Sequence, residues 1–179
     1  RMADRVMLQA GVNFTDLRTV SAGISTLLTA YQATGDQRYL DSATELVAQV
    51  LSWQQQQKGG LPTDFIYKAG LVTDSLVAYY RFTRDPRVLA GIRAAVDYSL
   101  LHFWDDEVGL IQNAGGLLFT SALDLLYRET GEEKYYQVNE RQIRVLADSL
   151  TVEQPKDVAL YYRNVFSFFN GARLPRNKK

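Results

Sequence analysis

The chain has no cysteine among its 179 residues and a single histidine, His102. The absence of cysteine excludes disulfides, thiolate zinc sites and thiol nucleophiles. A single histidine also excludes a site with several histidine ligands, so we expect no metal site. A chain without cysteine fits a cytosolic protein as well as an exported bacterial one, extracellular or periplasmic, so the compartment stays open.

An excess of charge of one sign is also missing, because 20 Lys and Arg residues balance 20 Asp and Glu residues. This balance gives no net attraction to nucleic acid or to an anionic membrane. No apolar run approaches the ~20 residues that a membrane span requires, and the first residues do not resemble a signal peptide. We therefore predict a soluble protein that binds neither nucleic acid nor membrane.

Motifs for nucleotide and serine chemistry are absent as well. The glycine pairs Gly59-Gly60 and Gly115-Gly116 lack the spacing and the lysine of a phosphate-binding loop. No Gly-x-Ser-x-Gly nucleophile elbow occurs. The sequence thus argues against nucleotide chemistry and serine hydrolysis, and we expect no cofactor.

What the chain does have is a repeat. Three times a tyrosine closes an apolar run and is followed, three residues on, by threonine and a turn with an acid and then a base. The copies are residues 31–38, 80–87 and 127–134. Their tyrosines are 49 and 47 residues apart, and a period of this size is typical of repeated helical hairpins.

Two kinds of helix alternate around these turns. After each turn comes a stretch with one apolar stripe, as in residues 36–53, which predicts an outer helix. The stretches before the turns are nearly uncharged, since residues 69–80 contain only Asp74 and residues 114–127 only Asp124. A helix without a polar face is normally enclosed by neighbours, so we interpret these stretches as inner helices. Residues 16–31 belong to the same kind, and residues 158–169 open a fourth.

This order predicts an all-α fold of antiparallel helical hairpins. The connections from an outer helix to the next inner helix, residues 54–68 and 104–113, are longer than the commonest connections of 2–6 residues. They carry most of the unusual side chains, and we expect them to meet at one rim. Function that resides in loops should therefore reside there.

The repeat resembles the (α/α)-toroid proteins, which include six-hairpin glycoside hydrolases, sugar epimerases of the acylglucosamine 2-epimerase type, and polysaccharide lyases. The residues that carry the resemblance are the run 70–88 and the turns at 34–36 and 130–132. The resemblance implies a ring of six or seven hairpins around a sugar-binding cleft, of which this chain offers about three and a half. We therefore expect a single domain over residues 1–179 that forms a partial toroid or arc. It would be a piece of a larger toroid or a half-ring completed by a homodimer.

The first connection mixes aromatic and polar groups suited to a sugar. Trp53 and Tyr67 offer flat apolar faces for sugar C–H surfaces, and Asp64 can bind hydroxyls. The alternative is that Trp53 packs in the core and that glutamines 54–57 form a solvated helix end.

The second connection concentrates acids beside an indole, with Trp104, Asp105 and Asp106 in a row and Asn113 at its end. Glycosidases need two carboxylates roughly 5 to 9.5 Å apart across the scissile bond, and adjacent residues cannot supply that opposition alone. A partner would come from Asp64 or Asp74. The alternative is a structural turn that ends at Gly109.

Inner-helix positions supply the remaining candidates. A carboxyl such as Asp74, if it lines a cavity, would have a raised pKa suited to a general acid, although the helix dipole could instead stabilise its charge. Tyr161 and Arg163 would suit an acidic sugar, with proton transfer by the phenol and bidentate binding by the guanidinium, or would simply pack. His102 is interpreted as a surface group at a helix end, with a catalytic base as the alternative.

These observations lead to a carbohydrate-active or carbohydrate-binding domain, as a glycoside hydrolase or polysaccharide lyase if it is an enzyme. Free N–H groups at the inner-helix starts would favour an acidic sugar. The candidate catalytic residues are Asp64, Asp74 and Asp105, and the candidate substrate-binding residues are Trp53, Tyr67, Trp104, Asp106, Asn113, Tyr161 and Arg163. The partner would be an oligo- or polysaccharide. The alternatives are a helical-repeat scaffold that binds other proteins and a half-ring that becomes an enzyme on dimerising.

Overall fold

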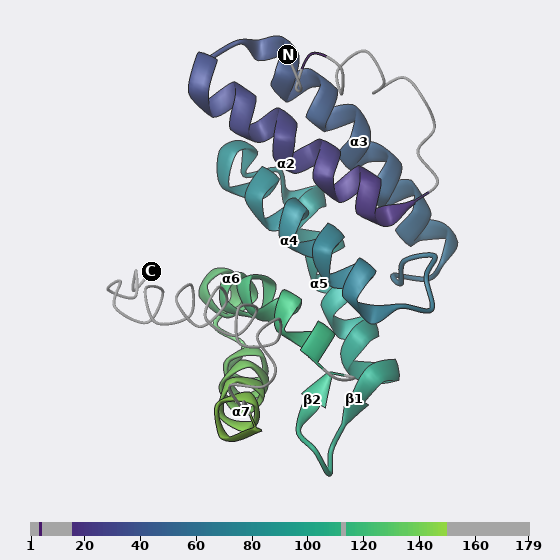
Figure 1. Cartoon of the computed structure of the whole chain (residues 1–179), viewed down its shortest axis with the longest axis vertical. Coiled ribbons are helices and arrows are strands. Elements are labelled where there is room, and N and C mark those ends of the chain that lie inside the picture. Colours follow the sequence, from purple (N-terminus) through teal and green to yellow (C-terminus); the bar gives the residue numbers. More distant parts are fainter. Residues whose placement is uncertain (1–3, 5–15, 112–113, 150–179) are drawn as a thin grey trace.

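The computed structural model describes Asp4, residues 16–111 and residues 114–149, and these residues confirm the all-α prediction (Figure 1). The elements in chain order are α2 (Leu17–Thr34), α3 (Gln37–Gln56), α4 (Ile66–Thr83), α5 (Pro86–Phe103), β1 (Trp104–Asp105), β2 (Leu110–Ile111), the 3-10 helix η1 (Ala114–Phe119), α6 (Thr120–Thr130) and α7 (Glu133–Ser149). The two short strands form an antiparallel hairpin with Trp104 opposite Ile111. The expected inner helix at residues 158–169 lies outside the described residues.

The helices form three stacked hairpins, α2–α3, α4–α5 and α6–α7. The inner helix α4 is central, since it packs on α2, α5, α6 and η1. The outer helices α3 and α5 pack on each other. In Figure 1 the connection from α3 to α4 lies toward the right, and the connection from α5 to α6, with β1 and β2, lies at the bottom. None of the described helices has the length and apolarity to span a bilayer.

The repeated turn ends each inner helix in the same way. The residue after the threonine takes a left-handed conformation and donates its backbone N–H to the carbonyl oxygen of the repeat tyrosine. This bond joins Gly35 to Tyr31, Arg84 to Tyr80 and Gly131 to Tyr127, at 2.7, 2.8 and 2.8 Å. The bond satisfies a carbonyl that the end of the helix would otherwise leave unpaired.

The acid of the first two turns then starts the outer helix. The carboxylates of Asp36 and Asp85 accept the backbone N–H groups of Arg38 and Arg87, which is an N-cap. The same arginine side chains bind these carboxylates and hold the pKa of each acid below its usual value. The repeat motif therefore ends one helix and starts the next. This structural role explains why the motif recurs, and no binding or catalytic role is needed.

The predicted difference between inner and outer helices holds for α4 and α3. Helix α4 buries most of its circumference and leaves one partly exposed stripe through Tyr67, Asp74 and Ala78, whereas α3 buries one stripe. Helix α2, also predicted as an inner helix, keeps an exposed face that includes Arg18 and Thr29. The large core residues come from all three hairpins: Leu27, Leu46, Leu76, Ile92, Phe119, Leu123 and Tyr135. Burial of such side chains is the main source of stability in the fold.

Polar contacts join neighbouring hairpins across the core. The hydroxyls of Ser21 and Ser75 lie 2.7 Å apart between α2 and α4. Between α4 and α6, Glu129 accepts hydrogen bonds from the Tyr80 hydroxyl at 3.2 Å and from Arg84 at 2.9 Å. Small side chains and paired polar groups therefore allow the inner helices to approach closely.

The predicted extent of the first connection was wrong. Helix α3 continues to Gln56 and α4 begins at Ile66, so the connection is residues 57–65 rather than 54–68. Gln54 is buried, and its Nε2 donates to the carbonyl of Gly91 at 2.9 Å. The missing side chain of Gly91 leaves room for this contact, because a Cβ there would collide with Leu51 and Gln54.

The third inner helix was predicted as one helix over residues 114–127, but its first residues have a different conformation. The segment from Ala114 is a 3-10 helix, and the α-helix begins only at Thr120. The backbone of Gly116 lies so close to the Ile111 carbonyl and to Gln142 that no side chain fits there. Glycine lowers helix propensity, and a 3-10 turn is a common form of helix start.

Candidate functional site

The starts of the inner helices lie at one rim of the molecule, as predicted. Asp16, the N-cap of α2, forms an ion pair of 3.5 Å with Lys68 in the first turn of α4. A Cβ built on Gly115 in η1 would lie 3.3 Å from the backbone nitrogen of Tyr67. We call Asp16, residues 57–68 and the β1–β2 hairpin (residues 104–111) the connection rim. In Figure 1 the connection before α4 lies at the right and the β1–β2 hairpin at the bottom.

Two aromatic rings are exposed at the start of α4. Phe65 is 59 % and Tyr67 is 37 % exposed, and their ring centroids are 6.0 Å apart. Lys68 places its Nζ 5.5 Å from the centroid of Phe65. Phe65 is also the N-cap residue of α4 and gives the helix no side-chain cap, whereas caps are usually Ser, Thr, Asp or Asn. An apolar ring in this position therefore does not serve the start of the helix.

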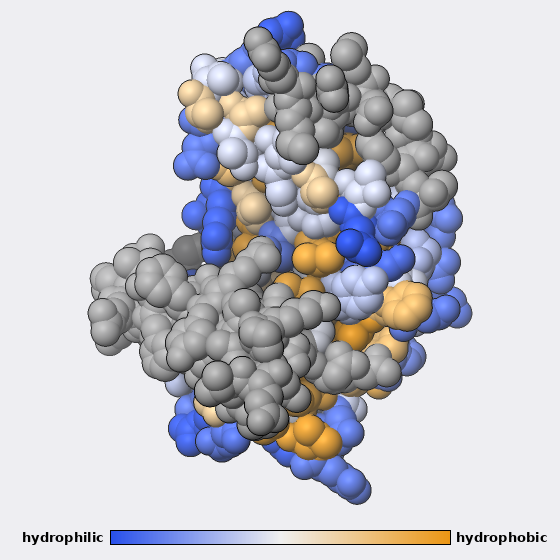
Figure 2. Space-filling view, in the orientation of Figure 1, coloured by the Kyte–Doolittle hydropathy of each residue, from blue (hydrophilic) through white to orange (hydrophobic). Residues whose placement is uncertain are grey.

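Tyr67 was a candidate from the sequence, but Phe65 was missed. The available signal was an aromatic residue in a polar connection, two positions before another aromatic residue. Figure 2 shows hydrophobic side chains over the start of α4 and the adjoining connection, between hydrophilic regions.

Trp53 and Asp64 lie in different surroundings. Trp53 is partly buried and packs against the hydrophobic core, which favours the packing interpretation over sugar binding. Asp64 is exposed in the connection, directly before Phe65. Asp16 reaches the same place through its ion pair with Lys68, and the backbone N–H of Arg18 holds the pKa of Asp16 below its usual value.

Asp105 shapes the turn of the β1–β2 hairpin. Its Oδ1 accepts the backbone N–H groups of Glu107 and Val108, both at 2.9 Å. Its carbonyl accepts the N–H of Gly109, whose φ of 82° suits glycine. The carboxylate proposed for catalysis is therefore engaged by its own backbone turn, which favours the structural alternative.

Trp104 and Asp106 attach the hairpin to α7. The indole Nε1 of Trp104 donates to Asp106 Oδ1 at 2.7 Å. The guanidinium of Arg141 lies over the Trp104 ring, 5.5 Å from its centroid, and also donates to the backbone carbonyl of Asp106. Both residues thus take part in a structural contact, which leaves fewer of their groups to bind a ligand.

The inner-helix carboxylates lie deeper than the rim. Ser121 donates its hydroxyl to Asp74 at 2.5 Å, between α6 and α4. One turn further on, the Asp124 side chain is 17 % exposed and forms an ion pair of 3.0 Å with Arg128. Burial raises the pKa of Asp124, and the hydrogen bond from Arg128 acts against it. From the sequence, Asp124 ranked below Asp74 as a candidate because it lies nearer the carboxy end of its helix, and its burial by neighbouring helices is not visible in the residue order.

The three candidate catalytic residues do not form a group. Asp105 is bound to its turn, Asp74 to Ser121, and Asp64 lies in the exposed connection. Asp74 is eight residues after Ile66, or roughly 12 Å along the axis of α4. Asp64, in the connection before α4, therefore starts from a backbone position about two turns away from that of Asp74.

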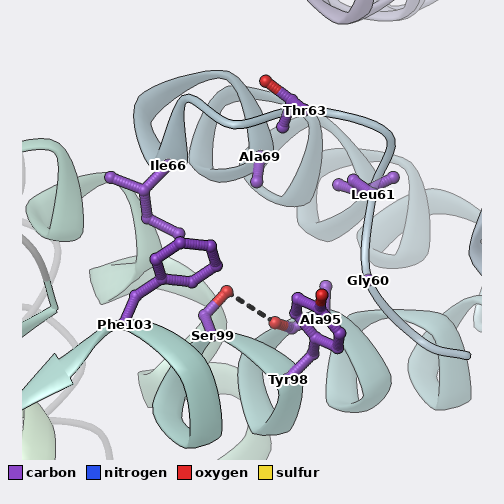
Figure 3. A pocket seen from close by; sticks show the side chains of 9 residues that line it. All are labelled: Gly60, Leu61, Thr63, Ile66, Ala69, Ala95, Tyr98, Ser99 and Phe103. Atoms are coloured by element: carbon purple, nitrogen blue, oxygen red, sulfur yellow. Dashed lines mark hydrogen bonds between the residues drawn. The ribbon is translucent and has the colours of Figure 1, made fainter. Parts of the chain in front are cut away.

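A small pocket lies beneath the first connection. Its volume is about 10 Å³, and its lining is mostly apolar: Gly60, Leu61, Thr63, Ile66, Ala69, Ala95, Tyr98, Ser99 and Phe103. Figure 3 shows the connection crossing over it and α5 below, with the Ser99 hydroxyl bonded to the Ala95 carbonyl. This volume holds about one water molecule, so a sugar ring cannot enter.

The remaining candidate residues add no group of side chains that would bind a sugar or a metal ion within the described residues. Asn113, Tyr161 and Arg163 lie outside the described residues. His102 is exposed at the end of α5, as expected of a surface group, and its ring lies tilted against that of Tyr98 with the centroids 4.2 Å apart. In the described part of the chain, no three His, Cys, Asp or Glu side chains are placed to share a metal ion.

Comparison with protein-family models and with curated proteins found no match to this chain. The helical hairpins and the geometry of the rim are therefore the observations from which a function can be argued.

Proposed function

We propose that the chain is a carbohydrate-binding domain of the (α/α)-toroid kind and that the sugar lies on the connection rim. The observation that carries this proposal is the exposed pair Phe65 and Tyr67 at the start of an inner helix. Flat rings in a wet surface suit the C–H faces of a sugar. The carboxylates of Asp64 and Asp16 and the Tyr67 hydroxyl would accept or donate hydrogen bonds to sugar hydroxyls.

Binding fits the described residues better than catalysis. The acids proposed for hydrolysis have separate surroundings, and the pocket beneath the connection is too small for a sugar ring. An exposed pair of rings needs neither an enclosed cleft nor opposed carboxylates. Hydrolysis or elimination would require groups beyond those that the rim brings together.

The test is a calorimetric titration of the chain with three classes of oligosaccharide, namely neutral sugars, amino sugars and acidic sugars. We expect at least one class to bind, and Phe65→Ala and Tyr67→Ala each to weaken that binding about three- to tenfold. Phe82→Ala is the matched control, because Phe82 is another exposed ring but lies at the opposite end of α4, where it contacts Tyr31. Equal weakening by Phe82→Ala, or no binding of any class, would refute the proposal.

A protein-binding scaffold is the second candidate, and one observation favours it. Leu101 is 78 % and Val108 is 50 % exposed, and both lie at the same end of the hairpins as Phe65. Exposed apolar residues that share one end of a molecule are typical of interfaces. The scaffold would bind no oligosaccharide, so the same titration separates the two functions.

A further inference from the structure

Three buried polar atoms lie where η1, α6 and α7 meet, and none of them has a hydrogen-bond partner among the described residues. They are Thr120 Oγ1, Asn139 Oδ1 and Gln142 Nε2. All three residues are at most 1 % exposed. An unpaired buried polar group is destabilising by about 1–3 kcal/mol, so three in one place need an explanation.

The orientation of both amides is fixed by their other atoms. Gln142 Oε1 accepts the backbone N–H of Ile111 at 3.0 Å, which leaves its Nε2 as a donor. Asn139 Nδ2 donates to the Thr120 carbonyl at 3.2 Å, which leaves its Oδ1 as an acceptor. Turning either amide over would break its existing bond. The unpaired set is therefore one donor, one acceptor and one hydroxyl that can do either.

The three groups also share one location. Asn139 and Gln142 are three residues apart on α7, so they lie on the same face of the helix. Asn139 reaches the first residue of α6, and Gln142 reaches both β2 and Gly116 of η1, four residues before Thr120. We propose that these three side chains bind an internal water molecule. It accepts from Gln142 Nε2, donates to Asn139 Oδ1 and completes its bonds with the Thr120 hydroxyl, about the three bonds typical of buried water.

Thr120→Val tests the proposal by the sign of its effect on stability. If a water molecule is bound, valine removes one of its partners, and the folding equilibrium constant should fall about fivefold in urea denaturation. Without the water, valine would remove an unpaired hydroxyl, and the constant would stay equal or rise. An equal or higher constant therefore overturns the proposal.

Thr73→Val is the matched control. Thr73 is equally buried and lies within α4, where its hydroxyl donates to the Ala69 carbonyl of the same helix. We expect a change within about twofold there, because that carbonyl keeps its helical bond. A nuclear Overhauser effect from water to the side-chain amide protons of Gln142, lost in Thr120→Val, is the direct observation in the full chain. Its absence in the wild-type chain also overturns the proposal.

Discussion

At the residue scale, single side chains in the turns do more than one task. Asp85 caps the first turn of α5 through the backbone N–H of Arg87 at 2.8 Å and also binds the Arg87 side chain. Exposed ion pairs contribute little to stability, whereas a cap satisfies a donor that the helix leaves unpaired. The cap should therefore dominate the contribution of Asp85.

Asp85→Ala is accordingly expected to lower the free energy of unfolding by about 1 kcal/mol, the usual effect of a lost N-cap. Urea denaturation at pH 7 measures it. Asp64→Ala is the control, because Asp64 is exposed in a connection and caps no helix, so its change should stay within about 0.5 kcal/mol. A smaller effect at Asp85 than at Asp64 would show that the cap does not contribute.

The same carboxylate should make stability depend on pH. The Arg87 side chain and backbone lower the pKa of Asp85 in the folded chain below that of the unfolded chain. A lowered folded pKa means that the contribution is present above about pH 4, near the unfolded value, and is lost as pH falls through the folded value.

Asp85→Asn keeps a capping side chain but cannot titrate, so its stability should fall less between pH 5 and pH 2 than that of the wild type. Thermal unfolding across this range measures the difference. Parallel curves for the two proteins would contradict the assignment of the lowered pKa to Asp85.

At the element scale, helices pack where one of them lacks a side chain. Gly91 allows α5 to approach α3, and a Cβ there would collide with Leu51 and Gln54. Replacing glycine by alanine inside a helix normally stabilises it by up to about 1 kcal/mol. Here we expect the opposite sign.

Gly91→Ala should lower the free energy of unfolding by about 1–3 kcal/mol, because it overpacks the contact between the helices. The double variant with Leu51→Ala tests the cause, since removing the leucine makes room for the new methyl group. Its loss should be clearly less than the sum of the two single losses in urea denaturation. Additive losses would mean that the collision with Leu51 is not the reason.

At the scale of the whole molecule, the fold was predictable because its signals are local. Each signal depends on residues that are close together in the sequence. Examples are the turns at Gly35, Arg84 and Gly131 and the apolar stripes of the outer helices. The end of α3 was not predictable, because the burial of Gln54 depends on Gly91, 37 residues further on.

The candidate site was predictable only in part for the same reason. That connections meet at one rim follows from the order of inner and outer helices. Whether a residue of the rim is exposed or engaged depends on its partners in space. Asp105 is held by its own turn and Trp104 by Arg141 of α7, while Phe65 and Tyr67 remain at the surface.

A stacked array of hairpins should also lose its structure unevenly, because the described helices of each hairpin pack mainly on the adjacent hairpin. Ser75 lies in the close contact between α2 and α4, 2.7 Å from the Ser21 hydroxyl and 3 % exposed. Ser75→Leu should force these helices apart and weaken the attachment of α2–α3. Amide hydrogen exchange followed by mass spectrometry should then show faster exchange in α2 and α3, with α6 and α7 nearly unchanged. Ser52→Leu is the control, because Ser52 is exposed on α3. Its amide exchange rates should equal those of the wild-type chain in all three hairpins. Faster exchange of equal size in all three hairpins would mean that they unfold as one cooperative unit, because the loss at one junction would then be transmitted through the whole core.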